Sequence, residues 1–328
     1  MNVRRQAFGV RTQSGIAAIT ALLVVALATM LAADLAWELH LDIRRSESML
    51  LRNQAKQFAL GAEIMAMEAL RQDFEEDRED NEFCDYPGEG WDTEMTLPFE
   101  GGTVRGQISD MQGRFNLNNL APNGSKDTRV FEQFERLLEG LDLDRELAPR
   151  VLDWIDPDQA EEFGGAEDNA YTSMTPPYRA ANTWFTTTSE LLAIQGVIDP
   201  EDPNGERFEL IERYVSALPP GEKINVNSAE DPVLRSFAVS PGTTTAEPLR
   251  ANRPYCNLLT GSGDGAFMDD ADGIVEPVFA NEVLDVSSNF FQLKVLVTLG
   301  SMQVTMYSLL HRDSDGVVTT SLRYFDTK

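Results

Sequence analysis

The sequence predicts an α+β fold: a long N-terminal helix packed on a small antiparallel sheet, with a large all-α domain inserted in the sheet. Three observations lead to this prediction. The chain begins with a long helical pattern, strand-like alternation occurs at residues 103–110 and 289–325, and helical patterns lie between those two regions. A long insertion is tolerable because the entropy of loop closure grows slowly with loop length.

The run Ile16–Ala33 holds eighteen residues without a charge. At about 1.5 Å per residue it spans roughly 27 Å, close to the roughly 30 Å hydrocarbon core of a bilayer. The charged residues before it are Arg4, Arg5 and Arg11. A basic flank ahead of the apolar run predicts that this end stays in the cytoplasm and that the rest is exported.

Two cleavage sites fit this segment. A secretory signal peptide would be cut after its apolar stretch, here at Ala32-Ala33. A cut at Gly15-Ile16 would instead leave the apolar helix attached as an anchor. We favour the second site, since the helical pattern continues directly from Asp34. We therefore expect a single-pass protein of the bacterial inner membrane, in contact with lipid through residues 16–33, with its C-terminal domain in the periplasm.

The helix is expected to continue well past the membrane, from residue 16 to 78, over about 95 Å. No proline occurs between Ala33 and Arg78. An apolar stripe at helical spacing is formed by Phe58, Ala62, Met65 and Ala69. An anchored coiled-coil stalk is the alternative, but the stripe is not a sustained heptad.

Residues 79–102 interrupt the helix with several glycines, asparagine and proline. A half-buried strand follows, in which apolar residues alternate with polar ones around Val104 and Ile108. The strongest strand pattern lies near the C-terminus, where Phe291 to Leu299 alternates, Gly300-Ser301 forms a two-residue hairpin turn, and alternation resumes from Met302. A turn at 313–316 precedes a last strand.

The middle of the chain shows short helical patterns. Apolar spacing predicts helices over 130–138, 147–155 and 208–215. Thr187 and Glu190 form a capping box before another helix, which Gly196 ends. Ser228 with Asp231 is expected to cap one more, extending to Phe237.

The formal net charge is −27, and loss of residues 1–15 would remove three arginines and no acid, which takes it to −30. Such a chain repels nucleic acid, which binds cationic surfaces, so no nucleic-acid partner is expected. Basic protein surfaces or divalent cations suit it better. Solubility of an exported domain explains much of the charge equally well.

Two cysteines occur, Cys84 and Cys256, without a CxxC pair. In an exported chain they predict one disulfide, which would close a loop of about 170 residues and add a few kcal/mol on the chain-entropy model. Two unpaired buried thiols are the alternative.

An acidic cluster is the strongest candidate for chemistry. It places seven carboxylates in sixteen residues, with no Lys or Arg between Arg150 and Arg179: Asp153, Asp156, Asp158, Glu161, Glu162, Glu167 and Asp168. Mutual repulsion would be relieved by a hard divalent cation, and Ca²⁺ fits flexible carboxylate loops, although the EF-hand order is missing. A solvated acidic loop is the alternative. A glycine-rich stretch with Asp264, Asp269, Asp270 and Asp272 is expected to be a mobile loop instead.

The motifs give little support to an enzyme. The histidines are His40 and His311, and neither lies in a motif with a serine or cysteine nucleophile. A pair of carboxylates at glycosidase spacing stays open. We expect no enzymatic activity and no catalytic residue.

The residues around the N-terminal junction, Ser14–Thr20, resemble the leader of type IV pilin-like proteins. Most members carry glutamate where this chain has Thr20, and the branch that lacks it is the K-type minor pseudopilin of type II secretion systems. The middle of the chain carries three more segments similar to that branch, namely Gly113–Asn118, Asp153–Asp156 and Lys223–Ala229. In the first and last of these, pairs of asparagines before a helix favour a structural role, in which side-chain hydrogen bonds bridge a loop to a helix start.

The resemblance implies five parts: a prepilin-type leader (1–15), an N-terminal helix (16–78, with 16–33 in the membrane), a pilin-like domain (79–119), an inserted α-domain (120–285) and the rest of the pilin-like sheet (286–328). It implies cleavage by prepilin peptidase between Gly15 and Ile16, methylation, and a calcium-bearing α-domain.

The resemblance also implies a position at the pseudopilus tip, where Thr20 needs no carboxylate for a subunit above it. The partners would be other minor pseudopilins and the inner-membrane secretion platform. Two alternatives are a membrane-tethered, metal-dependent periplasmic hydrolase and a minor pilin of a type IV pilus.

Overall fold

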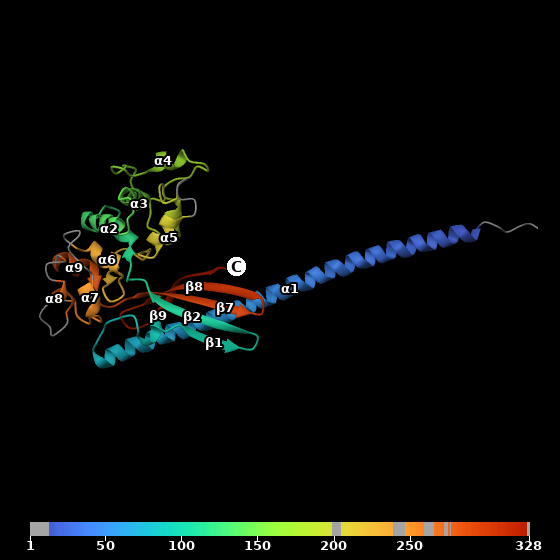
Figure 1. Ribbon diagram of the computed structural model, residues 1–328, viewed down its shortest axis with the longest axis horizontal. Coiled ribbons are helices and arrows are strands. Elements are labelled where there is room, and N and C mark those ends of the chain that lie inside the picture. Colours follow the sequence, from blue (N-terminus) through green and yellow to red (C-terminus); the bar gives the residue numbers. More distant parts are fainter. Residues whose placement is uncertain are drawn as a thin grey trace, which may run out of the picture.

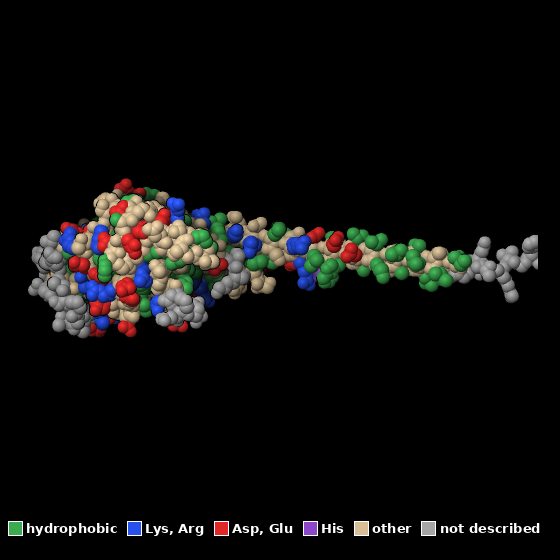
Figure 2. Space-filling view, turned by 90° about the horizontal axis from the view of Figure 1, so that it is seen from above, with side chains coloured by type: hydrophobic (Ala, Val, Ile, Leu, Met, Phe, Trp, Pro, Cys, Tyr) green, Lys and Arg blue, Asp and Glu red, His purple; other side chains and the backbone are tan. Residues whose placement is uncertain are grey.

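The computed structural model describes residues 13–198, 205–238, 247–258, 266–271, 275 and 277–326. Its longest element is the helix α1, Gln13–Asp80, whose N-terminal half projects from the rest as a single rod (Figure 1). Hydrophobic side chains run along the outer part of this rod, and charged ones gather nearer the body (Figure 2). An 18-residue window of the helix has a mean hydropathy of 2.5 and is fully unburied, as a membrane anchor requires.

The other half of α1 lies against one antiparallel sheet in the order β1-β2-β7-β8-β9. The strands are β1 (Met95–Phe99), β2 (Gly102–Asp110), β7 (Phe290–Leu299), β8 (Met302–Arg312) and β9 (Val318–Asp326). The strands predicted near 103–110 and 289–325 are present, and the predicted hairpin at Gly300-Ser301 joins β7 to β8. Because β2 pairs directly with β7, the whole segment between them is an insertion in the sheet.

Two details of this part differ from the expectation. Residues 79–102 were expected to be irregular, but Met95–Phe99 forms the edge strand β1. Its exposure does not alternate, which is why the sequence pattern missed it. The predicted stripe through Met65 is also wrong, since Met65 is 48% exposed. The buried face runs instead through Ala55, Ala59, Glu63, Ala66 and Leu70.

Glu63 interrupts the apolar period of that buried face, so the sequence pattern alone points to the neighbouring one. Arg323 of β9 donates to both oxygens of the Glu63 carboxylate, so its charge is paired. The alanines on either side let the helix approach the sheet closely, over side chains such as Val295 and Val304.

We call the segment 111–289 the helical block. Its 3-10 and α-helices are η2 (Leu117–Leu120), α2 (Thr128–Gly140), α3 (Leu147–Ile155), α4 (Asp168–Thr172), η3 (Thr188–Ala193), α5 (Glu206–Glu212), α6 (Asp231–Ser236), α7 (Glu247–Ala251), α8 (Phe267–Asp270) and α9 (Pro277–Val283). It also contains two short parallel pairs that the sequence did not predict, β3 (Phe115–Asn116) with β4 (Val215–Ser216) and β5 (Ile224–Asn225) with β6 (Leu284–Asp285). The block has its own hydrophobic core, distinct from the one under α1.

Most of the helices predicted for the helical block are present in the structure. The helices predicted at 130–138 and 147–155 are α2 and α3, and the Thr187–Glu190 capping box is present at η3. Two expectations are wrong. Val215 belongs to β4 rather than to the preceding helix. Ser228 does not cap α6, which follows Glu230 and carries a proline in its first turn, where a missing N–H costs nothing.

The paired asparagines bridge segments distant in sequence, as predicted for a structural role. Asn116 Oδ1 accepts from the backbone N–H groups of Asn118 and Leu218. Asn225 Oδ1 accepts from Asn227 N at 2.9 Å, and Asn227 Nδ2 donates to Tyr255 O at 2.8 Å. The hydrogen bonds of these asparagines therefore hold distant segments of the block together.

Candidate cation site in the helical block

The acidic cluster lies on the loop between α3 and α4. Asp156 follows the last residue of α3, and Glu167 precedes the first residue of α4. One carboxylate oxygen from each of Asp156, Asp158 and Glu167 lies within 4.8 Å of the others. Asp156 is 7% exposed and Glu167 is 3% exposed, so two of the three carboxylates are buried.

Buried oxygens at this site lack a hydrogen-bond donor among the described residues. They are Asp156 Oδ1 and both side-chain oxygens of Glu167. Buried carboxylate oxygens without a partner carry a desolvation cost unless a proton or a cation compensates it. Accordingly, burial and the neighbouring carboxylates raise the pKa of Glu167 to about 7, and burial raises the pKa of Asp156.

The other four predicted ligands have different surroundings. Asp153 is fully buried and accepts from the backbone N–H of Glu162 at 3.2 Å, so it holds the loop at its start. The side chain of Glu162 pairs with Lys126 at 3.0 Å. Asp168 lies 3.5 Å from Arg179 and accepts from Ala180 N. Glu161 is exposed. The structure thus brings together three of the seven, with Asp153 directly behind them.

Glycine allows the loop to fold back. A Cβ on Gly165 would lie 1.9 Å from Asp153 Oδ2, so no other residue fits without displacing that carboxylate. Gly164 has a φ of +84°, a left-handed conformation that side chains disfavour. The two glycines therefore set the path that returns Glu167 to Asp156.

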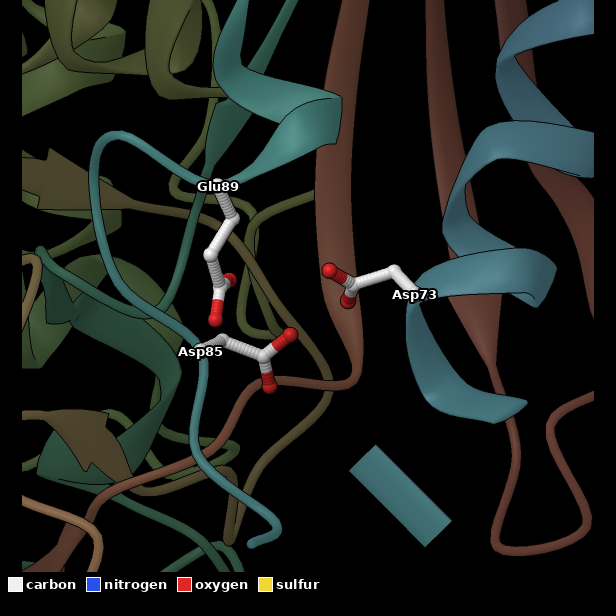
Figure 3. Close-up of side chains that lie close together, drawn as sticks. All are labelled: Asp73, Asp85 and Glu89. Carbon is white, nitrogen blue, oxygen red and sulfur yellow. The ribbon is translucent and has the colours of Figure 1, made fainter. Parts of the chain in front are cut away.

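A second acidic group lies at the end of α1, and the sequence did not reveal it. Asp73, Asp85 and Glu89 point toward one another from α1 and the segment that follows it (Figure 3). Here a cation is already present, because Arg312 of β8 donates to Asp85 at 2.5 and 2.6 Å and to Asp73 at 3.0 Å. We assign no metal to this group. No local spacing could have found it, since Arg312 is more than two hundred residues from both partners in sequence.

The remaining predicted residues are placed as follows. Thr20 lies in the projecting part of α1, where its hydroxyl donates to Ile16 O and Ala17 O, at 3.1 and 3.0 Å. Gly15 and Ile16 are inside the same helix. Cys84 and Cys256 are bonded to each other, with a Cα–Cα distance of 4.9 Å.

Part of the chain predicted to matter lies outside the described residues. The leader residues Arg4, Arg5 and Arg11 belong to this part, as do Asp264 and Asp272 of the glycine-rich loop. The expectation of a loop is wrong for Asp269 and Asp270, which lie in the helix α8; only their backbone is described.

The chain is 35% identical to the type II secretion system protein K of Pseudomonas aeruginosa, over 95% of this chain and 93% of that protein. It belongs to the type II secretion system protein K family. The family model described as type II secretion system (T2SS), protein K, matches residues 113–220, within the helical block. The protein K of Aeromonas hydrophila is 26% identical over 93% of this chain and 95% of its own length. The family assignment makes the chain a minor pseudopilin of type II secretion.

The fold has a solved counterpart in the crystal structure of the GspK-GspI-GspJ complex from the type 2 secretion system of enterotoxigenic Escherichia coli. One chain of that complex matches with a TM-score of 0.66 and 22% identity, covering 87% of this chain and 100% of its own. The predicted α+β architecture, a long helix on an antiparallel sheet with a helical insertion, is confirmed.

Proposed function

We propose that this minor pseudopilin is a non-enzymatic assembly subunit at the tip of the pseudopilus, anchored in the inner membrane with its body in the periplasm. The observation that carries the proposal is the position of the helical block. It extends from the end of the sheet opposite the projecting apolar part of α1 (Figure 1). With the projecting part of α1 in the bilayer, the block lies far from the membrane. It also makes the subunit wide, whereas subunits packed side by side in the shaft of a pseudopilus would need to be narrow.

The residue at position 20 supports the same position. Thr20 offers no negative charge to the processed N-terminus of a neighbour, and its hydroxyl is hydrogen-bonded to its own helix. A subunit with none above it needs no such charge. Because the solved counterpart is held in a complex of three Gsp proteins, we propose other minor pseudopilins as the partners of this chain.

Secretion and assembly can be tested together. In a strain whose own protein K gene is deleted, the full chain should restore secretion and co-purify from detergent with the other minor pseudopilins. A variant in which a short linker replaces residues 111–289 should still insert in the membrane and should fail to restore secretion. Restored secretion by that variant, or no co-purifying pseudopilin with the full chain, would contradict the tip proposal.

Processing tests the proposed membrane arrangement. A prepilin peptidase must accept a backbone without a side chain before the helix, so Gly15→Val should yield a chain still carrying residues 1–15. Edman sequencing or mass spectrometry of the N-terminus measures this, with Gly61→Val as a variant that should be processed normally. Normal processing of Gly15→Val, or a mature N-terminus after Ala33, would oppose it.

We propose that the loop between α3 and α4 binds Ca²⁺ through Asp156, Asp158 and Glu167. The support is chemical: the donors are all carboxylate oxygens, two of the groups are buried, and three of their oxygens have no donor in the described chain. Bound there, Ca²⁺ would supply structural stabilisation by replacing the missing donors. Asp153 would orient the loop from behind, through its bond to Glu162 N.

Melting temperature provides the test, because a cation that binds the folded loop stabilises it by about 2.7 kcal/mol at a hundredfold excess over its Kd. Ca²⁺ should raise the melting temperature of the full chain in detergent, and Mg²⁺ should raise it less, since it demands tighter octahedral geometry. Asp156→Ala with Asp158→Ala should remove most of the effect. The exposed loop residue Glu161, changed to Ala, is the matched control, and Asp269→Ala with Asp270→Ala should also leave the effect intact. Equal melting with Ca²⁺ and with chelator would eliminate the site.

A further inference from the structure

The segment from the end of α1 to residue 92, which we call the strap (residues 81–92), joins α1 to the edge of the sheet. It is held at several points. Cys84 is bonded to Cys256 in the helical block. Asp85 N donates to Val286 O at 3.0 Å, and Asp85 O accepts from Asn225 at 2.8 Å. Near its far end Trp91 packs edge-on against Phe291, with ring centroids 5.2 Å apart. The strap therefore connects all three parts of the molecule.

Arg312 holds the inner end of the strap to α1. Its guanidinium is 4% exposed and donates to Asp73 on α1, to Asp85 on the strap and to the carbonyl of Ser288. Asp85 also accepts from Ser288 N at 2.7 Å, so this carboxylate has donors on every side. Asp85 is thus bonded to Arg312 and to Ser288, two residues before β7.

The carboxyl groups around this ion pair outnumber the cation. The titratable groups around the Arg312–Asp85 pair come from α1, the strap, the end of β2 and β6. Apart from the phenol of Tyr86 they are all carboxyl groups: Asp73, Glu76, Asp77, Asp80, Glu82, Asp85, Glu89, Asp110 and Asp285. Oxygens of Asp73, Asp85 and Glu89 lie within 4.8 Å of one another (Figure 3). One guanidinium among three such carboxylates leaves an excess of negative charge when all are ionised.

We propose that Asp73, Asp77 and Glu89 make the contact between the strap and α1 a pH-sensitive latch, closed while the group holds a proton and loosened when every carboxyl is ionised. Asp77 and Glu89 are only partly buried. Glu89 accepts from Tyr86 N at 3.1 Å and from Trp91 Nε1 at 2.6 Å, both within the strap, so it can move away from Asp73 together with that part of the strap, whereas Asp85 stays with Arg312. The disulfide at Cys84 keeps the strap attached to the helical block in both states.

The direction of the pH dependence follows from the pKa values. Burial is the largest cause in each case and neighbouring carboxylates add to it, so the pKa rises to about 6 for Asp73, about 7 for Asp77 and about 8 for Glu89. The folded state binds these protons more tightly than the unfolded one. The stabilisation is therefore fully present below the unfolded values near 4 and is lost as the pH rises from there through the folded values of about 6 to 8.

Hydrogen–deuterium exchange of the full chain in detergent, with chelator present and the disulfide intact, tests the latch. After correction for intrinsic exchange rates, the protection of residues 86–90 and of the last two turns of α1 should fall by roughly tenfold or more between pH 6 and pH 9, whereas Asp85 N, bonded to Val286 O, should keep its protection. The β7–β8 hairpin should keep its protection. A pH-independent strap, or an equal loss of protection in the hairpin, would overturn the proposal.

Variants separate the latch from a general effect of pH. Glu89→Gln fixes the neutral state of that group and should keep the strap protected at pH 9. Glu75→Gln on α1, which removes a surface partner of Arg71, should leave the pH response as it is. Should Glu89→Gln fold poorly, Asp77→Asn at the rim gives the same readout. If the loss of protection between pH 6 and pH 9 is the same in Glu89→Gln, or in Asp77→Asn where that variant replaces it, as in the unmodified chain, the latch proposal is overturned.

Discussion

At the scale of single residues, polar side chains at the boundary between the sheet and the helical block carry much of the organisation. Asn225 is fully buried and its amide nitrogen lies within 3.0 Å of three acceptors, on Asp85, Asp110 and Ser288. Asp110 also accepts from the Ser288 hydroxyl at 2.7 Å. These bonds unite β2, the strap and the residues before β7, which are separated by up to about two hundred positions.

Asn225→Ala should lower the free energy of unfolding by about 2–3 kcal/mol, because it leaves the carbonyl of Asp85 and the carboxylate of Asp110 with fewer donors in a buried place. Denaturant unfolding followed by near-UV circular dichroism measures the change. Asn53→Ala, on the exposed surface of α1, is the control and should change stability by less than about 0.5 kcal/mol. A similar small loss for Asn225→Ala would mean that water replaces the amide.

At the scale of elements, close approach between backbones decides how the pieces fit. Gly113 lies three residues after the end of β2, against the loop before α6. A Cβ there would be 2.7 Å from Ser228 O and 2.8 Å from Ser228 Cβ. The α1 helix makes a comparable close approach to the sheet through its alanines, with the Glu63–Arg323 pair holding it to β9.

Gly113→Ala should destabilise the fold by about 1–3 kcal/mol, the cost typical of overpacking, because backbone atoms cannot move aside as a flexible side chain could. Gly61→Ala is the matched opposite case. It is inside α1 with open space around its Cβ position, and it should stabilise by about 0.5–1 kcal/mol. Thermal unfolding of both variants gives the comparison, and loss of stability in Gly61→Ala alone would reverse the packing argument.

The Glu63–Arg323 pair should make the contact of α1 with the sheet sensitive to acid. Burial opposes ionisation of Glu63, but the hydrogen bonds and the charge of Arg323 help to outweigh it, so its pKa is lowered. The stabilisation is then present above the unfolded value near 4.5 and is lost as the pH falls through the lower folded value. Glu63→Gln should therefore cost more stability at pH 7 than at pH 3, measured by denaturant unfolding. Glu68→Gln, which alters an exposed pair with Arg71, should cost little at either pH, and an equal cost for Glu63→Gln at both would refute this.

At the scale of the whole molecule, one covalent link and one ion-pair network join the helix, the sheet and the block. The cystine bonds the strap to the segment after α7, across a sequence separation of 172. One residue further on, Asp85 is tied to β8 through Arg312. Neighbouring positions of the strap thus fasten it to the block and to the sheet.

The two cysteines should be unreactive in protein isolated from cells without a reductant. A thiol reagent in denaturant should label neither Cys84 nor Cys256 until a reductant is added, after which mass spectrometry should find both labelled. Labelling of both in denaturant alone would show that they are unpaired in the cell. A shift in unfolding temperature on reduction would then report how much the link stabilises the body.

By itself, the sequence determined the features that depend on local pattern. The apolar run of α1, the alternation of β2, β7 and β8, the capping box before η3 and the family resemblance could all be read from neighbouring residues. It also pointed to the loop between α3 and α4 as the candidate cation site, because all seven acids lie within sixteen positions. Only the tertiary structure decided which of them converge, since the return of Glu167 to Asp156 depends on the glycine turn and on Asp153 behind it. The same holds for Glu63, which broke the helical stripe, and for Arg312, whose partners lie far away in the chain. Only tertiary packing brings such residues together. A local sequence pattern carries no information about contacts between residues that are far apart in the chain.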